Sequence, residues 1–209
     1  MSLADQLRRL LALGVADLAG ISARELSGHV ASLADEPTAV VAIHPRLVPA
    51  RLLTPLLRRQ DQEGFVVEDL TDLEEFVPAT GVTIPDQPVY LLHGVERGDE
   101  LRNASPDEAL PAILARGRTP LTIGEGLSWL LQEPDRLEPN HCFMTIGSRR
   151  PVGRRLDART PAVWISGGTG RDGRHRRGAP KVGWCWAGNR HTWLGFASAG
   201  SRRALRGVR

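Results

Sequence analysis

The residues best suited to chemistry lie close together near the C-terminal end, in the stretch KVGWCWAGNRHTWLGFASAG from Lys181 to Gly200. Cys185 and His191 are close enough in sequence to meet across a tight loop. A thiolate paired with an imidazolium is a competent nucleophile, and Asn189 could orient the histidine or stabilise an oxyanion. An enzyme with a Cys185–His191 site is therefore one hypothesis, although the sequence identifies no orienting acid beside it.

Three tryptophans share this stretch, at Trp184, Trp186 and Trp193. At the two-residue period of a strand, Trp184 and Trp186 point to one side and Cys185 to the other. The AGNRH segment favours a hairpin loop, which would return Trp193 on a neighbouring strand. The three indoles could then form either the core of a small β region or a part-exposed aromatic platform for a ligand.

The preceding segment, GGTGRDGRHRRGAPK, is rich in glycine and arginine. It contains G-x-G-x-x-G, but RHRRGAP does not begin a helix and no acid follows to hold a ribose, so neither a dinucleotide site nor a P-loop is indicated. The guanidinium groups suit oxyanions. The segment predicts either a solvated flexible loop or contacts to an anionic partner through Arg174, Arg176, Arg177 and Arg190.

Zinc would have to use His141, Cys142, Cys185 and His191. Adjacent residues on a strand point to opposite faces, so His141 and Cys142 could not readily hold one ion, and the chain has no CxxC or HxxxH spacing. We therefore expect no metal site, and no motif indicates a cofactor.

Charge is distributed unevenly along the chain. Residues 1–148 hold 12 arginines and 22 acids, a net of −10, whereas residues 149–209 hold 15 basic residues and two acids, a net of +13. This asymmetry predicts either an anionic partner for the C-terminal part or mutual attraction between the two parts. Both interpretations stay open at the level of sequence.

Helix starts are marked by Ser or Thr followed three residues later by an acid, which is the pattern of a capping box. Four clear examples and a weaker one, Ser2 with Asp5, occur: Ser22 with Glu25, Thr71 with Glu74, Ser105 with Glu108, and Thr122 with Glu125. Leucine spacing predicts a further helix over residues 50–60. Short apolar runs at 38–44, 65–67 and 88–94 predict strands.

After residue 141 the pattern changes to four strand candidates, CFMTIG, AVWIS, VGWCW and HTWLGFAS. We expect an α+β protein, in which a mixed α/β acidic part (1–140) packs on a mainly antiparallel sheet (141–200). Residues 1–200 are predicted to form a single integrated domain, and residues 201–209 a basic flexible tail.

The remaining composition indicates a cytoplasmic protein. Two cysteines cannot make a disulfide framework, and the opening MSLADQLRRLLALG is patterned as an amphipathic helix rather than a signal peptide. No run approaches the ~20 apolar residues of a membrane span, so no membrane partner is expected.

Several motifs together resemble an uncharacterised actinobacterial family, a domain of unknown function. They are PVYLLHGVERGDEL, RGRTPLTIGEGLSWL, HCFMTIGSRR, AVWIS and, most specifically, GWCWAGN-x-HTWLG from Gly183 to Gly195. The GGTGRDGRHRRG segment looks longer than the corresponding link in that family. The resemblance implies one integrated unit, and it implies no activity or catalytic residue.

Two functions from different classes follow. The first is a non-enzymatic binding protein whose basic, tryptophan-rich C-terminal face engages an anionic partner, either nucleic acid or an acidic protein. The second is an enzyme of unknown reaction with its site at Cys185 and His191.

Overall fold

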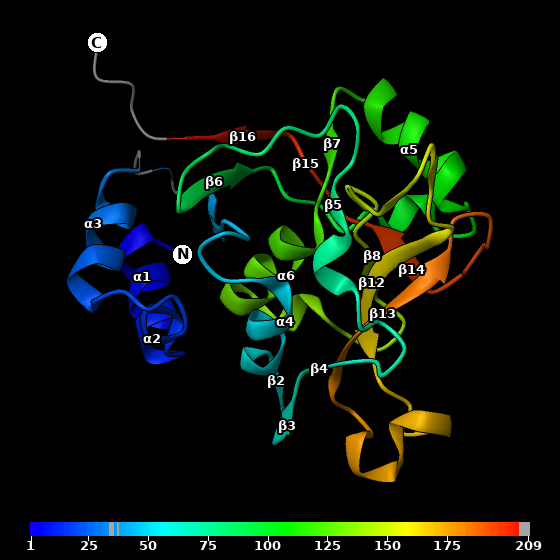
Figure 1. Ribbon diagram of the computed structural model, residues 1–209, viewed down its shortest axis with the longest axis horizontal. Helices are drawn as coiled ribbons and strands as arrows, with labels where there is room; N and C mark the ends of the chain where they lie inside the picture. The colour runs from blue at the N-terminus through cyan, green and yellow to red at the C-terminus, as the bar shows by residue number, and fades with distance from the viewer. Residues whose placement is uncertain (34–35, 37, 205–209) are drawn as a thin grey trace.

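A buried helix, α6 (Ile123–Gln132), lies between two β-sheets in the computed structural model, which describes residues 1–33, 36 and 38–204 (Figure 1). The first sheet has three antiparallel strands in the order β1-β6-β16. Their bounds are β1 (Val40–Ile43), β6 (Val89–His93) and β16 (Ser201–Arg203).

The second sheet has five strands in the order β14-β8-β12-β13-β4. They are β14 (Leu194–Phe196), β8 (Cys142–Met144), β12 (Arg159–Ile165), β13 (Pro180–Trp186) and β4 (Phe65–Val66). β12 pairs antiparallel with both of its neighbours, while the two edge strands, β14 and β4, pair parallel with theirs.

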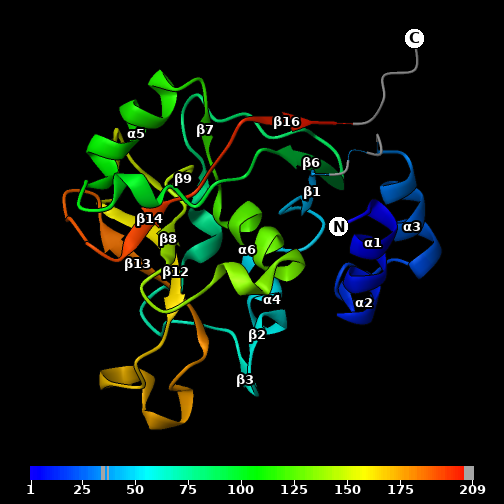
Figure 2. The same cartoon turned by 180° about the vertical axis from the view of Figure 1, so that it is seen from behind.

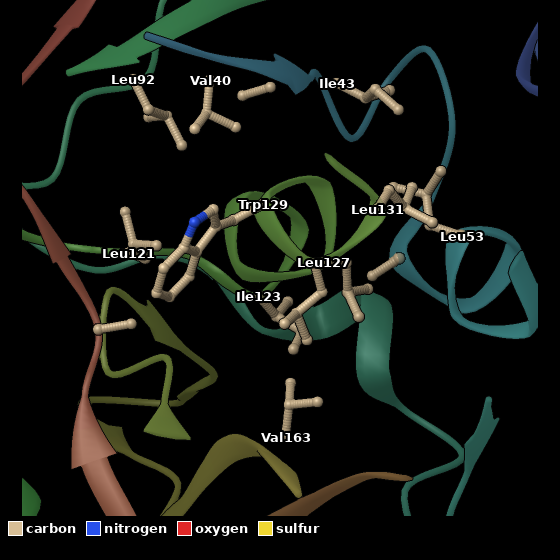
Figure 3. Close-up of a cluster of buried hydrophobic side chains, with 14 of the residues drawn as sticks. Val40, Ile43, Leu53, Leu92, Leu121, Ile123, Leu127, Trp129, Leu131 and Val163 are labelled. Carbon is tan, nitrogen blue, oxygen red and sulfur yellow. The ribbon is translucent and has the colours of Figure 1, made fainter. Parts of the chain in front are cut away.

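Helix α6 can occupy the centre because its sequence, IGEGLSWLLQ, lets both sheets approach it. All ten of its residues are buried, as expected of a helix that is apolar around most of its circumference. A Cβ at Gly126 would lie 2.7 Å from Thr145 Cγ2, so glycine is required where β8 passes. Figure 3 shows Val40 and Ile43 on one side of α6 and Val163 on the other.

Three helices form a group at the opposite end of the molecule from the five-stranded sheet, and the first of them packs against the free edge of β1 (Figures 1 and 2). They are α1 (Leu3–Ala12), α2 (Val15–Leu18) and α3 (Ala23–Ala31). The side chain of Gln6 accepts from the Val41 amide at 2.8 Å and donates to the Ala39 carbonyl at 2.7 Å. It therefore satisfies backbone groups that an edge strand would otherwise leave unpaired.

Shorter elements complete the fold. The other helices are α4 (Ala50–Leu53) and α5 (Pro106–Ala115), with 3-10 turns η1 (Thr54–Leu56), η2 (Leu73–Glu75), η3 (Asp99–Leu101), η4 (Pro134–Arg136), η5 (Gly170–Asp172) and η6 (Arg174–Arg176). Four two-stranded ladders join β2 (Arg58–Arg59) to β3 (Gln62–Glu63), β5 (Val77–Pro78) to β9 (Ser148–Arg149), β7 (Thr119–Pro120) to β15 (Ser198–Ala199), and β10 (Pro151–Val152) to β11 (Arg155–Leu156).

The expected α+β class is confirmed, and so are most of the expected helix starts. Capping boxes are present at Ser2, Ser22, Ser105 and Thr122. The box expected at Thr71 is wrong, because only the 3-10 turn η2 forms there and no side chain caps it. The helix expected over 50–60 is also cut short, since Pro55 lacks an amide hydrogen and the chain leaves α4 through η1.

The hairpin predicted between the tryptophan strand and HTWLGFAS does not form. β13 pairs with β12 and β4, whereas β14 pairs with β8 at the far edge of the sheet. Residues 187–193 therefore cross the ends of β12 and β8, which lie between β13 and β14. Three strand spacings separate β13 from β14 by ~14 Å, and seven residues can span that distance. The local turn signal was correct, but the partner strand is set by packing elsewhere in the chain.

The predicted flexible tail is wrong for residues 201–203, which form β16 against β6. A side chain holds this strand in place in addition to its backbone hydrogen bonds. Arg202 points into the protein, where its guanidinium pairs with buried Glu125. Residues 205–209 of the predicted tail lie outside the described part of the chain. One core cluster of buried side chains runs from Leu3 to Ala199 and draws on both sheets.

Candidate functional site

The predicted tryptophan and arginine residues are distributed over both ends of the β12–β13 hairpin. Its register pairs Arg159 with Trp186 at one end and Ile165 with Pro180 at the other. Seven residues of strand separate these ends by ~20 Å. The tryptophan pair therefore lies at one end, and the segment that carries Arg174, Arg176 and Arg177 lies beyond the other.

The tryptophans are also divided between the two faces of the sheet. Trp184 and Trp186 share one face, as predicted, while Trp164 lies on the opposite face over Gly183, where a Cβ would be 2.4 Å from the indole. Trp193 packs edge-on against Trp164, with ring centroids 6.1 Å apart. The predicted platform of three indoles is therefore wrong, because β14 does not neighbour β13.

Trp184 and Trp186 form a compact aromatic pair with a centroid distance of 4.6 Å and an interplanar angle of 69°. The indole nitrogen of Trp184 donates to Asp69 at 3.3 Å, and the Arg159 guanidinium lies 6.0 Å from the Trp184 ring centre. Trp184 is half-buried and Trp186 is 47% exposed. This end of the sheet thus presents one accessible indole rather than a broad stacking surface.

The arginine beside this pair is fully engaged by carboxylates. Arg159 donates to Asp72 at 2.6 and 3.1 Å and to Asp157 at 2.6 Å, and Arg150 joins the same cluster. Hydrogen bonds from Arg159 are the main reason that the pKa values of Asp72 and Asp157 lie below the ordinary range. Arg159 therefore stabilises the fold and has little capacity left for a ligand.

Seven of the 13 basic residues described in the C-terminal part pair with acids of the N-terminal part. Such ion pairs join Arg149 to Asp107, Arg150 to Asp72 and Glu75, Arg159 to Asp72, Arg171 to Asp69, Arg190 to Glu108, Arg202 to Glu125, and Arg203 to Glu36. The prediction of mutual attraction between the oppositely charged parts is confirmed. Arg190, one of the predicted binding residues, is among those paired, and its side chain is 57% exposed.

The Cys185–His191 pair is not assembled. Cys185 is buried in the core, and burial raises the pKa of its thiol to about 11. His191 packs against Trp193 at 5.6 Å, burial lowers its pKa, and no hydrogen bond joins it to Cys185 in the described residues. Asn189 is exposed, and its backbone amide donates to the Trp186 carbonyl at 3.0 Å, which closes a turn.

The segment between β12 and β13, residues 166–179, is called the arginine loop below. Buried Asp172 accepts from Ser166 Oγ at 2.7 Å and from Lys181 Nζ at 2.8 Å, and Ser166 Oγ accepts from the Gly168 amide. These hydrogen bonds fix the loop from inside. The flexible loop expected from composition is therefore replaced by a structured one.

The arginine loop extends away from the body of the protein (Figures 1 and 2). Arg174 and Arg177 are exposed, and neither forms an ion pair with any residue that the structure describes. The Arg176 guanidinium stacks over the Phe65 ring at 4.4 Å, which leaves its edge able to donate hydrogen bonds. This arrangement can bind oxyanions at the tip of the loop.

One buried polar cluster was missed by sequence reasoning. Glu125 is fully buried and accepts from Tyr90 Oη at 2.9 Å, from the Thr122 amide at 2.7 Å and from Arg202 Nη2 at 2.7 Å. The capping box identified Glu125 only as a local helix cap. Nothing local to residue 125 marks Arg202, which is far along the chain, as its partner.

The structure describes no group of three or more His, Cys, Asp or Glu side chains placed to hold a metal ion. His141 lies with Asp99, Arg97 and Arg102, away from Cys185. Over the same residues, none of the helices combines the length and apolar character needed to cross a bilayer.

A family model described as a family of unknown function, DUF5701, matches residues 9–205. The chain belongs to the DUF5701 family. The match includes both sheets and α6, so the family covers nearly the whole fold. No curated protein and no solved structure matches the chain, and the family's description states no activity.

Proposed function

We propose that this DUF5701 protein is a non-enzymatic binding protein whose arginine loop contacts the phosphate groups of a nucleic acid. The supporting observation is the pair Arg174 and Arg177, which the loop holds at an exposed tip while most other arginines of this part are paired internally. A guanidinium group recognises phosphate bidentately. Such phosphate contacts position a protein on a nucleic acid and carry no sequence information directly.

A nucleic acid is favoured over an acidic protein because the arginine loop has no apolar centre. None of the large hydrophobic side chains that are exposed in the described residues falls within residues 166–181. Protein interfaces usually have a buried apolar core, whereas phosphate contacts need only positive charge. Within this proposal the protein is cytoplasmic and actinobacterial, with Gly183 to Gly195 as the family signature.

The test is fluorescence anisotropy with labelled single- and double-stranded oligonucleotides over a salt series. Two or three phosphate contacts predict that log K falls with log salt at a slope of about −2 to −3 for a duplex. The double variant Arg174→Gln/Arg177→Gln should lose two phosphate contacts, so the magnitude of its slope should be smaller by about two.

Arg190→Gln is the matched control, because Arg190 is paired with Glu108 at the other end of the hairpin. It should leave the slope unchanged. Absent or salt-independent binding would refute the proposal, as would an unchanged slope in the Arg174/Arg177 double variant. Binding to poly-glutamate but not to oligonucleotides would identify an acidic protein as the partner instead.

A further inference from the structure

An apolar cavity of about 290 Å³ lies at the N-terminal end of α6, and no residue of the arginine loop lines it. Its walls are formed by the segment after β1 and by the region from η2 to β5, including Pro49, Phe76, Val77 and Ile84. The volume is about twice that of the ~150 Å³ apolar cavity that admits benzene in another protein. The cavity is therefore large enough for a small organic molecule.

The floor of this cavity carries hydrogen-bond donors that have no acceptor in the described residues. Ser148 Oγ accepts from the Ile123 amide at 2.9 Å, and Thr122 Oγ1 accepts from the Glu125 amide at 3.4 Å, but neither hydroxyl donates to a described group. Both side chains are more than nine-tenths buried. The Gly124 amide, in the first turn of α6, also has no described acceptor.

The charges around these donors favour an acceptor with a negative charge. The start of a ten-residue helix carries partial positive charge. Glu125 caps the Thr122 amide at 2.7 Å and its own charge is paired with Arg202, so it leaves the Gly124 amide without an acceptor. Glu74 also lines the cavity, but it accepts from the Arg51 amide and is paired with the Arg51 guanidinium.

Arg46 also lines the cavity, and its guanidinium pairs with exposed Asp86. We propose that the cavity binds a small carboxylate with an apolar body, such as an aryl or short acyl acid. The carboxylate accepts from the Gly124 amide and from the hydroxyls of Thr122 and Ser148. The apolar body packs against Phe76, Val77 and Ile84.

Phenylacetate is a suitable probe, and 2-phenylethanol is its uncharged counterpart. In two-dimensional ¹H–¹⁵N NMR titrations of the full chain, phenylacetate should shift the amide signals of Gly124 and Ser148 with a Kd of about 1 mM or tighter. 2-Phenylethanol should bind roughly tenfold more weakly, since it lacks the charge-assisted hydrogen bonds. Ser148→Ala should weaken phenylacetate binding about tenfold.

Val77→Trp tests the location, because Val77 is 44% exposed at the cavity and the larger ring would fill it without disturbing the core. This variant should lose binding. Leu114→Trp on α5, at a comparably exposed position, should bind normally, and so should the Arg174/Arg177 double variant. No shift at Gly124, equal binding by Val77→Trp, or equal affinity for the neutral alcohol would each overturn the proposal.

Discussion

Cys185 shows at the scale of a single residue how burial governs reactivity. Its side chain leaves β13 on the face opposite Trp184 and enters the core, where burial raises its pKa to about 11. Burial also raises the pKa of the Cys142 thiol on β8 to about 11. A thiol of this kind is inert, since the reactive species is the thiolate.

We therefore expect Cys185 to resist iodoacetamide at pH 8 in the folded protein. At pH 8 its thiolate fraction should be on the order of a hundredfold lower than that of an exposed cysteine. As long as the pH stays below the pKa, this fraction and the labelling rate should increase about tenfold for each unit by which the pH is raised. Mass spectrometry after timed labelling measures this for each cysteine separately, and labelling in urea is the control. Fast labelling of Cys185 in the native protein would revive the enzyme hypothesis.

At the scale of elements, the ion pair between α6 and β16 joins the centre of the fold to its last strand. The side chains of Arg202 and Glu125 are 6% and 0% exposed, and Arg202 also donates to Thr119 and to the Pro120 carbonyl. Neighbouring Arg203 pairs with Glu36 at the surface and is 62% exposed. The two arginines therefore have the same charge in the same strand but very different burial.

Arg202→Met should lower the free energy of unfolding by about 3–5 kcal/mol, because it leaves the charge of Glu125 buried and unpaired. Arg203→Met, the matched control, should change it by less than about 1 kcal/mol. Urea unfolding followed by tryptophan fluorescence measures both. Adding Glu125→Gln to Arg202→Met should recover part of the loss. Equal effects of the two single substitutions would contradict this account.

At the scale of the whole molecule, the two halves of the sequence exchange strands. β4 from the N-terminal part forms an edge of the five-stranded sheet, while β15 and β16 from the C-terminal part pair with β7 and β6. Opposite net charges of the two parts reinforce this exchange through ion pairs. Neither part retains a complete core when separated from the other.

A fragment of residues 141–209 should therefore not fold alone, because it lacks α6 and the edge strand β4. Its ¹H–¹⁵N spectrum is expected to show the narrow dispersion of an unfolded chain. Mixing it with residues 1–140 at low salt should restore dispersion, since the fragments attract each other electrostatically. A well-dispersed spectrum from either fragment alone would show that the protein has two separable domains.

The amino-acid sequence by itself determined features that depend on a few neighbouring residues. The capping boxes at Ser22, Ser105 and Thr122 formed as expected, because their hydrogen bonds close within one helical turn. Trp184 and Cys185 took opposite faces of β13, since alternation is a local property of an extended chain.

Tertiary structure alone decided which distant groups meet. It placed β14 beside β8 instead of β13, and it paired Arg202 with Glu125 instead of leaving it in a tail. It also brought Thr122, Ser148 and Phe76 around one cavity. Such contacts depend on the packing of both sheets around α6, and no spacing of residues along the chain records them.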